Sequence, residues 1–253
     1  MALPLPPGLT HAEVAFLAEM EMVTVVPRQR FESIDLLSGK TPALRPPHRA
    51  QLPLWLALLL KKQRRANIVP PSWLHPVSLS SIINRETKED PVAFSPPPPP
   101  PSRAIPSAPG TARRLADSSD ANLAPPFLPS CTADAPAGYL PYHWLEVAEA
   151  LLAHAGDDMP VPPGEVRSLL RDLVEVRAAK MRSSTSAFEG FGDGLMSLTG
   201  VGAMELAESR GFVLGVVDGV RKIGASAEAT RREEEEAGGQ RGDYEGSDEE
   251  MGI

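Results

Sequence analysis

The 253-residue sequence has very little cysteine, and Cys131 is the only one. A single cysteine excludes an intrachain disulfide and a cysteine-rich zinc site, which fits a reducing compartment. Long apolar runs are also missing: the longest, residues 52–60, includes a proline and is less than half of the roughly 20 residues that a membrane helix needs. The N-terminus has no basic segment followed by an apolar one, so no secretory signal is expected. We therefore expect a soluble intracellular protein.

Motifs that carry catalysis are absent as well. No two histidines stand three or four residues apart, and the glycine clusters match neither GxGxxG nor GxxxxGK[ST]. The only tight pair of acids outside the tail and the helix surfaces is Asp157-Asp158, which we interpret as part of a turn between helices because no acid–base partner stands nearby. The sequence thus predicts no catalytic, cofactor-binding or metal-binding residues.

Proline, by contrast, is abundant and unevenly spread. Of the 28 prolines, 12 fall in residues 95–138, which contain few large apolar groups. Such a segment cannot bury enough surface to offset its ordering entropy, so we expect a disordered insertion there. Residues 225–253 are expected to be a disordered acidic tail. From residue 231 onward this tail has nine acidic and three basic residues, a net charge of −6, which leaves the rest of the chain with −2 of the total −8. Strong binding of duplex DNA is therefore not the default expectation.

The remaining regions predict an α+β fold that is mostly α. In residues 1–52, a capping box at Thr10–Glu13 predicts a helix, and residues 22–26 and 31–37 predict strands, the second closed by a turn at 38–40. We expect a small β-rich N-terminal domain there. Apolar periodicity and proline positions predict a helical-bundle domain made of residues 53–94 and 139–224, interrupted by the insertion. Its expected helices lie near residues 53–65, 76–89, 141–156, 163–182 and 207–224.

Two features point to contacts with other chains. The helix at residues 54–60 is apolar on every side, so a chain of this size is expected to leave part of it for a partner. Arg177 shares the phase of the apolar stripe on its helix, with Lys180 three residues on. A charge there either finds an acid or carbonyl from another helix or another subunit, or reaches solvent from the edge of the core. The basic cluster at residues 61–65 is either a solvated helix end or the phosphate-binding part of a stand-alone nucleic-acid-binding module.

Several ordered motifs resemble the second Psf subunit of the eukaryotic GINS DNA replication complex, in a fungal form. Residues 11–19 followed by 23–27 resemble the opening of that family, and residues 53–57 with 60–61 and then 70–73 resemble its most recognisable stretch. Residues 151–155, 165–167 and 177–182 continue the pattern. The resemblance covers residues 10–94 and 139–224, although the last helix matches poorly.

The resemblance implies a non-enzymatic scaffold role in the nucleus. It implies a heterotetramer with three other GINS subunits, which joins the MCM helicase ring and its Cdc-family partner in the replicative helicase assembly. It also implies an indirect link to the replicative polymerase machinery, a part in initiation and elongation of replication, and a contribution to chromosome segregation. No cofactor and no membrane contact are expected, and contact with DNA is expected to be weak or indirect. The candidate interface residues are Trp55, Leu56, Leu60, Trp73, Arg177 and Lys180.

Overall fold

The computed structural model describes residues 9–37, 39–99, 129–183 and 198–242, with side chains up to residue 233. The chain divides into a compact unit of residues 1–208 and a second unit of residues 209–253, which are described separately. Within the described residues, no helix combines the length and apolar character needed to cross a membrane.

The N-terminal elements follow the sequence signals. Helix α1 (His11–Ala18) begins with the predicted capping box: the Glu13 amide donates to the Thr10 hydroxyl at 3.3 Å, and the Thr10 amide donates to the Glu13 carboxylate at 2.7 Å. Strand β1 (Met22–Pro27) follows, and four of its six residues are buried. The predicted strand at 31–37 is mostly wrong. Only β2 (Asp35–Leu36) pairs, with β3 (Gly39–Lys40), while Phe31 makes a single bridge to Leu44.

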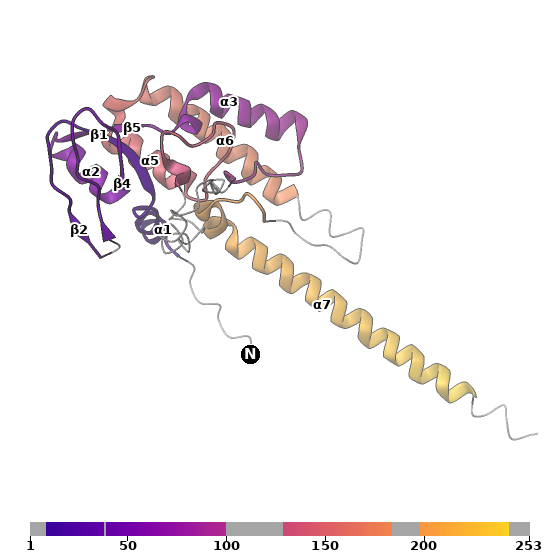
Figure 1. The fold of residues 1–253 in the computed structure, drawn as a ribbon. Coiled ribbons are helices and arrows are strands. Elements are labelled where there is room, and N and C mark those ends of the chain that lie inside the picture. The colour runs from indigo at the N-terminus through magenta and orange to yellow at the C-terminus, as the bar shows by residue number, and fades with distance from the viewer. Residues whose placement is uncertain (1–8, 38, 100–128, 184–197, 243–253) are drawn as a thin grey trace, which may run out of the picture. The chain divides into compact units, whose positions relative to one another are not determined.

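The main sheet has the order β4-β1-β5, with both neighbours antiparallel to β1 (Figure 1). In strand β4 (Ala50–Pro53), Leu52 lies opposite Val23 of β1. In strand β5 (Ala66–Val69), Ile68 lies opposite Val25 of β1. Strand β5 corrects our expectation that residues 53–94 are helical throughout. It was missed because four residues directly after a basic run give almost no period-two signal. The sheet of the N-terminal region therefore extends past residue 52.

Helix α2 (Leu54–Lys62) confirms the predicted apolar helix. It has no side-chain cap; instead, its first two amides, from Leu54 and Trp55, donate to the carbonyls of Glu21 at 2.8 Å and Glu19 at 3.1 Å. The bend between α1 and β1 thus satisfies donors that a helix start leaves free. Five of its nine residues are buried, so this chain covers most of the helix.

The helical part contains η1 (Ser72–Leu74), α3 (Pro76–Asn84), the π-helical turn η2 (Arg85–Glu89), α5 (Trp144–His154), η5 (Gly156–Asp158) and α6 (Pro163–Ser183). Helices α3, α5 and α6 confirm the periodicity, and α3 lies beside α6 (Figure 1). One continuous core joins these helices to the main sheet. Its largest fully buried apolar side chains include Trp73, Leu79, Trp144, Leu151 and Leu173.

The structure corrects the C-terminal boundary of the expected insertion, residues 95–138. A short 3₁₀ turn, η4 (Pro129–Cys131), packs against β1, and Cys131 is fully buried. The Ala133 amide donates to the Thr24 hydroxyl at 3.0 Å, and the Ser72 hydroxyl donates to the Ala135 carbonyl. Residues 129–138 therefore belong to the folded body despite their composition, because backbone groups can be satisfied there without large apolar side chains. The interior of the insertion, residues 100–128, lies outside the described residues.

Helix α7 (Ala203–Gly242) begins in the first unit and continues through the second. It corrects both the expected helix end at residue 224 and the expected disorder from 225, since residues 225–242 are helical. The segment 225–236 is rich in alanine, glutamate and arginine, which are strong helix formers, and this propensity outweighs the repulsion among its acids. The end of the expected tail, residues 243–253, lies outside the described residues.

Candidate functional site

The most densely connected polar group in the first unit surrounds Arg177 of α6. Its side chain is 1% exposed, yet every part of the guanidinium has a partner. Nε and Nη2 donate to the two carboxylate oxygens of Glu205 on α7, at 2.5 and 2.9 Å, and Nη1 donates to Glu86 on η2 at 2.5 Å. Nη2 also donates to the Gly200 carbonyl at 2.6 Å. The expectation of an acid from another helix is confirmed, and the acids come from this chain.

Lys180, one turn further along α6, also contacts Glu86. Its ammonium donates to the carbonyls of Asp90 at 2.7 Å and Ala93 at 2.6 Å and lies 3.4 Å from the second oxygen of Glu86. The Ser95 amide also donates to Glu86, at 3.0 Å. Two cations and two carboxylates thus meet without excess charge, and they tie α6 to η2, to residues 90–95 and to the start of α7. We call Arg177, Lys180, Glu86 and Glu205 the ionic cluster.

The pKa values in the ionic cluster reflect this balance. Burial alone would raise the pKa of Glu86, but the charge of Arg177, the Ser95 amide and the charge of Lys180 together hold that pKa below its usual value. Burial lowers the pKa of Lys180, and Glu86 offsets this only in part. The pKa of Arg177 stays above its ordinary value because Glu205 and Glu86 outweigh burial. The contacts of Glu86 therefore favour its ionised form.

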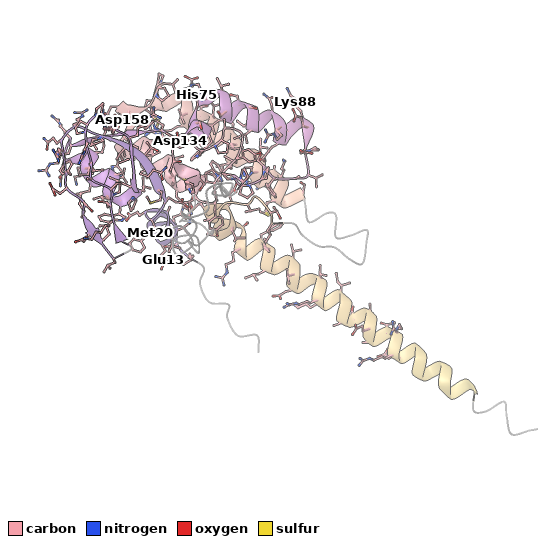
Figure 2. All side chains as sticks on the ribbon, viewed as in Figure 1. Glu13, Met20, His75, Lys88, Asp134 and Asp158 are labelled. Atoms are coloured by element: carbon pink, nitrogen blue, oxygen red, sulfur yellow. The ribbon has the colours of Figure 1, made fainter. Side chains whose placement is uncertain are left out.

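A second ion pair joins α2 to the turn after α5. Lys61 is buried, and its ammonium lies 2.7 Å from a carboxylate oxygen of Asp157 and 2.8 Å from one of Asp158. The other oxygen of Asp158 accepts the Ile68 amide of β5 at 2.7 Å. Asp158 therefore links the helical part to the sheet, and Figure 2 shows it beside the sheet.

We interpreted residues 61–65 as one basic cluster, either solvated or phosphate-binding. The structure corrects this for Lys61, whose charge is already paired with Asp157 and Asp158. It also fits the interpretation of Asp157-Asp158 as part of a turn. The hydrogen bond and charge of Lys61 hold the pKa of Asp157 below its usual value. Burial lowers the pKa of Lys61, but the two carboxylates raise it by more than burial lowers it. The pKa of Lys61 therefore lies above its ordinary value.

Replacing Asp158 by asparagine is expected to destabilise the chain by about 1–3 kcal/mol, because a buried charge-assisted contact with Lys61 is weakened. The change keeps the shape of the side chain and leaves an oxygen for the Ile68 amide. Urea unfolding of the full-length chain measures the loss. Asp172→Asn, at an exposed position on α6, is the matched control and is expected to stay within about 0.5 kcal/mol. Equal stability of the two variants would contradict a structural role for the pair.

The six candidate interface residues differ in what they leave accessible. Leu56, Leu60, Trp73, Arg177 and Lys180 are at most 6% exposed and are already covered by this chain. Trp55 is only partly buried, on the same helix as Leu59, which is 44% exposed. Contact of these residues with a partner stays a prediction, and Trp55 is the one of the six with surface left for it.

The sequence did not reveal the roles of Glu86 and Glu205, or the ion pairs of Lys61 with Asp157 and Asp158. Glu86 lies 91 residues before Arg177, so no local pattern joins them. Glu205 does carry a local signal, because it stands in the first turn of α7 and accepts the Gly202 amide at 2.7 Å. That is an acid at a helix start, where the helix dipole favours it.

The described residues contain no group of three or more histidine, cysteine, aspartate or glutamate side chains arranged to hold a metal ion. The polar groups brought together by the fold join parts of the chain to one another. This arrangement, a small sheet followed by a helical bundle whose buried charges join its elements, is that of a structural component.

Comparison with known proteins identifies the family. Residues 10–69 match the PSF2 N-terminal domain, and residues 73–224 match the GINS complex protein helical bundle domain. The chain is 76% identical over 273 residues to the DNA replication complex GINS protein psf2 of Neurospora crassa and 70% identical over 253 residues to that of Gibberella zeae, in each case with both chains fully covered. It is 52% identical over 255 residues to the Aspergillus fumigatus protein, with 92% of each chain covered.

The chain therefore belongs to the Psf2 family of GINS proteins, a family of non-catalytic structural components of a DNA replication complex. The resemblance seen in the ordered motifs is confirmed, as is the division into a β-rich N-terminal part and a helical bundle.

Proposed function

We propose that this chain is a scaffold subunit of a nuclear GINS heterotetramer. In this role it supports the initiation and elongation of chromosomal replication as part of the replicative helicase assembly. Its direct partners are the three other GINS subunits. The assembled complex contacts the MCM helicase ring and its Cdc-family partner, reaches the replicative polymerase machinery indirectly, and contributes to chromosome segregation. Support comes from family membership and from the relatives' names, which place them in a DNA replication complex.

The observation that carries the proposal is an apolar face on the second unit. Phe212, Val216, Val220 and Ile223 of α7 recur at intervals of four, four and three, and so share one side of the helix. Phe212, Val220 and Ile223 are 40%, 45% and 70% exposed. A helix with such a stripe gains stability by burying it against another helix. We call these four residues the apolar face of α7.

A row of small residues borders this face. Gly211, Gly215 and Gly219 stand four residues apart. Apart from adjacent residues and the helix's own backbone, no atom of the described residues lies within 4 Å of where a Cβ would stand on any of them. Small residues every four positions favour close packing against another helix, and among the described residues no such neighbour is present. A partner helix from another subunit is the occupant we propose, since backbones can approach closely where side chains are absent.

The double substitution Phe212→Asp/Ile223→Asp is expected to abolish recovery of the tetramer when the four subunits are co-expressed. Two charges would then replace apolar anchors at a helix–helix contact, where truncation of a hot-spot residue costs about 2 kcal/mol or more. Affinity capture through a tag on another subunit, followed by size-exclusion chromatography, measures assembly.

The matched control is Leu37→Asp/Val92→Asp, which places the same charges at positions 112% and 81% exposed in the first unit. This control is expected to assemble normally. A tetramer that forms equally well with both double variants would overturn the proposed role of α7. The stand-alone nucleic-acid-binding module, the alternative considered from sequence, is not favoured, because the chain aligns over its full length with GINS subunits.

A further inference from the structure

Positive charge is concentrated in one segment of this acidic chain. Residues 28–65 contain nine lysines and arginines against two acids, a net charge of +7, whereas the whole chain has −8. The near-neutral average that argued against DNA binding therefore hides a segregated distribution, with the basic residues in the N-terminal part.

The structure separates these nine cations into two groups. Lys61 is held by Asp157 and Asp158, and Lys40 lies 3.3 Å from Asp35. The other seven are exposed, and none of them forms an ion pair with an acid among the residues that the structure describes. We call these seven the basic face: Arg28, Arg30, Arg45, Arg49, Lys62, Arg64 and Arg65.

Backbone contacts hold the basic face together. The Arg28 amide donates to the Arg65 carbonyl at 2.7 Å, where the end of β1 lies beside the start of β5. The Arg65 guanidinium carbon lies 5.7 Å from the centre of the Phe31 ring. Two hydrogen bonds, of 2.9 and 3.0 Å, join Phe31 to Leu44, and the next residues outward are Arg30 and Arg45.

The basic face continues from Arg45 to the start of β4, the edge strand of the sheet. Arg45, His48 and Arg49 line one open hollow beside β4, and the His48 amide donates to the Arg45 carbonyl at 2.8 Å. The arginines thus stand next to the end of β1, the start of β5, the bridge of Phe31 with Leu44, and the start of β4. The acid that interacts with Arg28 is Asp157, whose carboxylate is already bound to Lys61.

We propose that the basic face binds the phosphate backbone of DNA, weakly and without sequence preference. Six of its seven members are arginines, whose planar forks match the oxygens of a phosphate. Unpaired cations set out in succession suit a polyanion that repeats one charge along its length. The proposal rests on the proposed function in one respect: a subunit of a DNA replication complex meets DNA as its nearest polyanion.

The test uses the co-purified complex and the double substitution Arg45→Glu/Arg64→Glu. Fluorescence anisotropy with labelled single-stranded and duplex oligonucleotides, over a series of salt concentrations, gives Kd and its salt dependence. At low salt the double variant is expected to bind at least about tenfold more weakly than wild type, and the slope of log K against log salt for duplex DNA is expected to shrink by about two. Single-strand and duplex arms show which form is bound more tightly.

The matched control is Lys88→Glu/Arg171→Glu, which makes the same change of net charge at exposed positions of the helical part. In Figure 2, Lys88 lies toward the other end of the helical part from Asp158. The control is expected to keep wild-type affinity. An equal loss of affinity in both variants would overturn the basic face as a site, as would absence of DNA binding by the wild-type complex.

Tighter binding of an acidic peptide such as polyglutamate, lost in the same double variant, would also overturn the proposal and assign the surface to a protein partner. Size-exclusion chromatography separates this question from the proposed function. If the tetramer does not form, the scaffold role fails. If it forms but does not bind DNA through these residues, only the basic face fails.

Discussion

Replacing Arg177 by methionine is expected to lower the free energy of unfolding by about 3–5 kcal/mol, because Glu86 and Glu205 lose the cation that compensates them. Methionine keeps an unbranched apolar stem of similar reach, so the loss reports the charge rather than a large cavity. Glu86 is 1% exposed and keeps Lys180 at 3.4 Å and the Ser95 amide at 3.0 Å, neither of which replaces a guanidinium contact at 2.5 Å. Urea unfolding of the full-length chain measures this change.

The control is Glu175→Gln on the same helix, at an exposed position, with an expected effect of about 0.5 kcal/mol or less. A further variant, Arg177→Met/Glu86→Met, removes one carboxylate together with the cation and is expected to recover part of the loss. If Arg177→Met unfolds like wild type while tetramer assembly fails, the guanidinium serves a partner chain rather than this fold.

Local signals in the sequence predicted the elements whose stability depends on neighbours along the chain. The capping box fixed the start of α1, apolar periodicity placed α5 and α6, and Pro53 marked the start of α2. Strand β5 depends on β1, which lies about forty residues earlier, so four residues of sequence were not enough to reveal it.

The ionic cluster was only half predictable for the same reason. The helical phase of Arg177 indicated that, if buried, it would need an acid or carbonyl, but the identity of that partner depends on how η2 and α7 pack. Composition misled at residues 129–138, where backbone hydrogen bonds to Thr24 and Arg85 fix a segment that is poor in large apolar side chains. It also misled at residues 225–242, where helix propensity outweighs net charge.

The second large effect on stability is expected at Glu21, and its size depends on pH. The residue is fully buried, and neither carboxylate oxygen has a hydrogen-bond partner among the described residues. Burial raises the pKa of Glu21 to about 8; the neighbouring Cys131 thiol limits this rise, and the carboxylate of Glu146 adds to it. Glu146 is itself buried, with one oxygen 3.4 Å from His143 and the other unpartnered among the described residues. At neutral pH the folded chain therefore keeps Glu21 mostly protonated.

The sign of the pH dependence follows from this raised pKa. The folded state holds a proton that the unfolded chain releases near pH 4.5, so the stabilising contribution is complete below about pH 4.5 and is lost as the pH rises toward about 8. Each pH unit in that window costs about 1.4 kcal/mol. Glutamine has nearly the same shape and never ionises, so it removes this cost.

Glu21→Gln is accordingly expected to stabilise the chain by about 3 kcal/mol at pH 7, by more at pH 8, and by almost nothing near pH 4.5. Urea unfolding at several pH values measures the difference between variant and wild type, with Glu175→Gln as the exposed control that shows no such trend. A difference that stays constant from pH 5 to pH 8 would mean that Glu21 does not hold a proton in the fold. The turn η4 would then close over an ionised carboxylate, and its burial beside Glu146 would require a counter-charge from outside the described residues, such as a partner subunit.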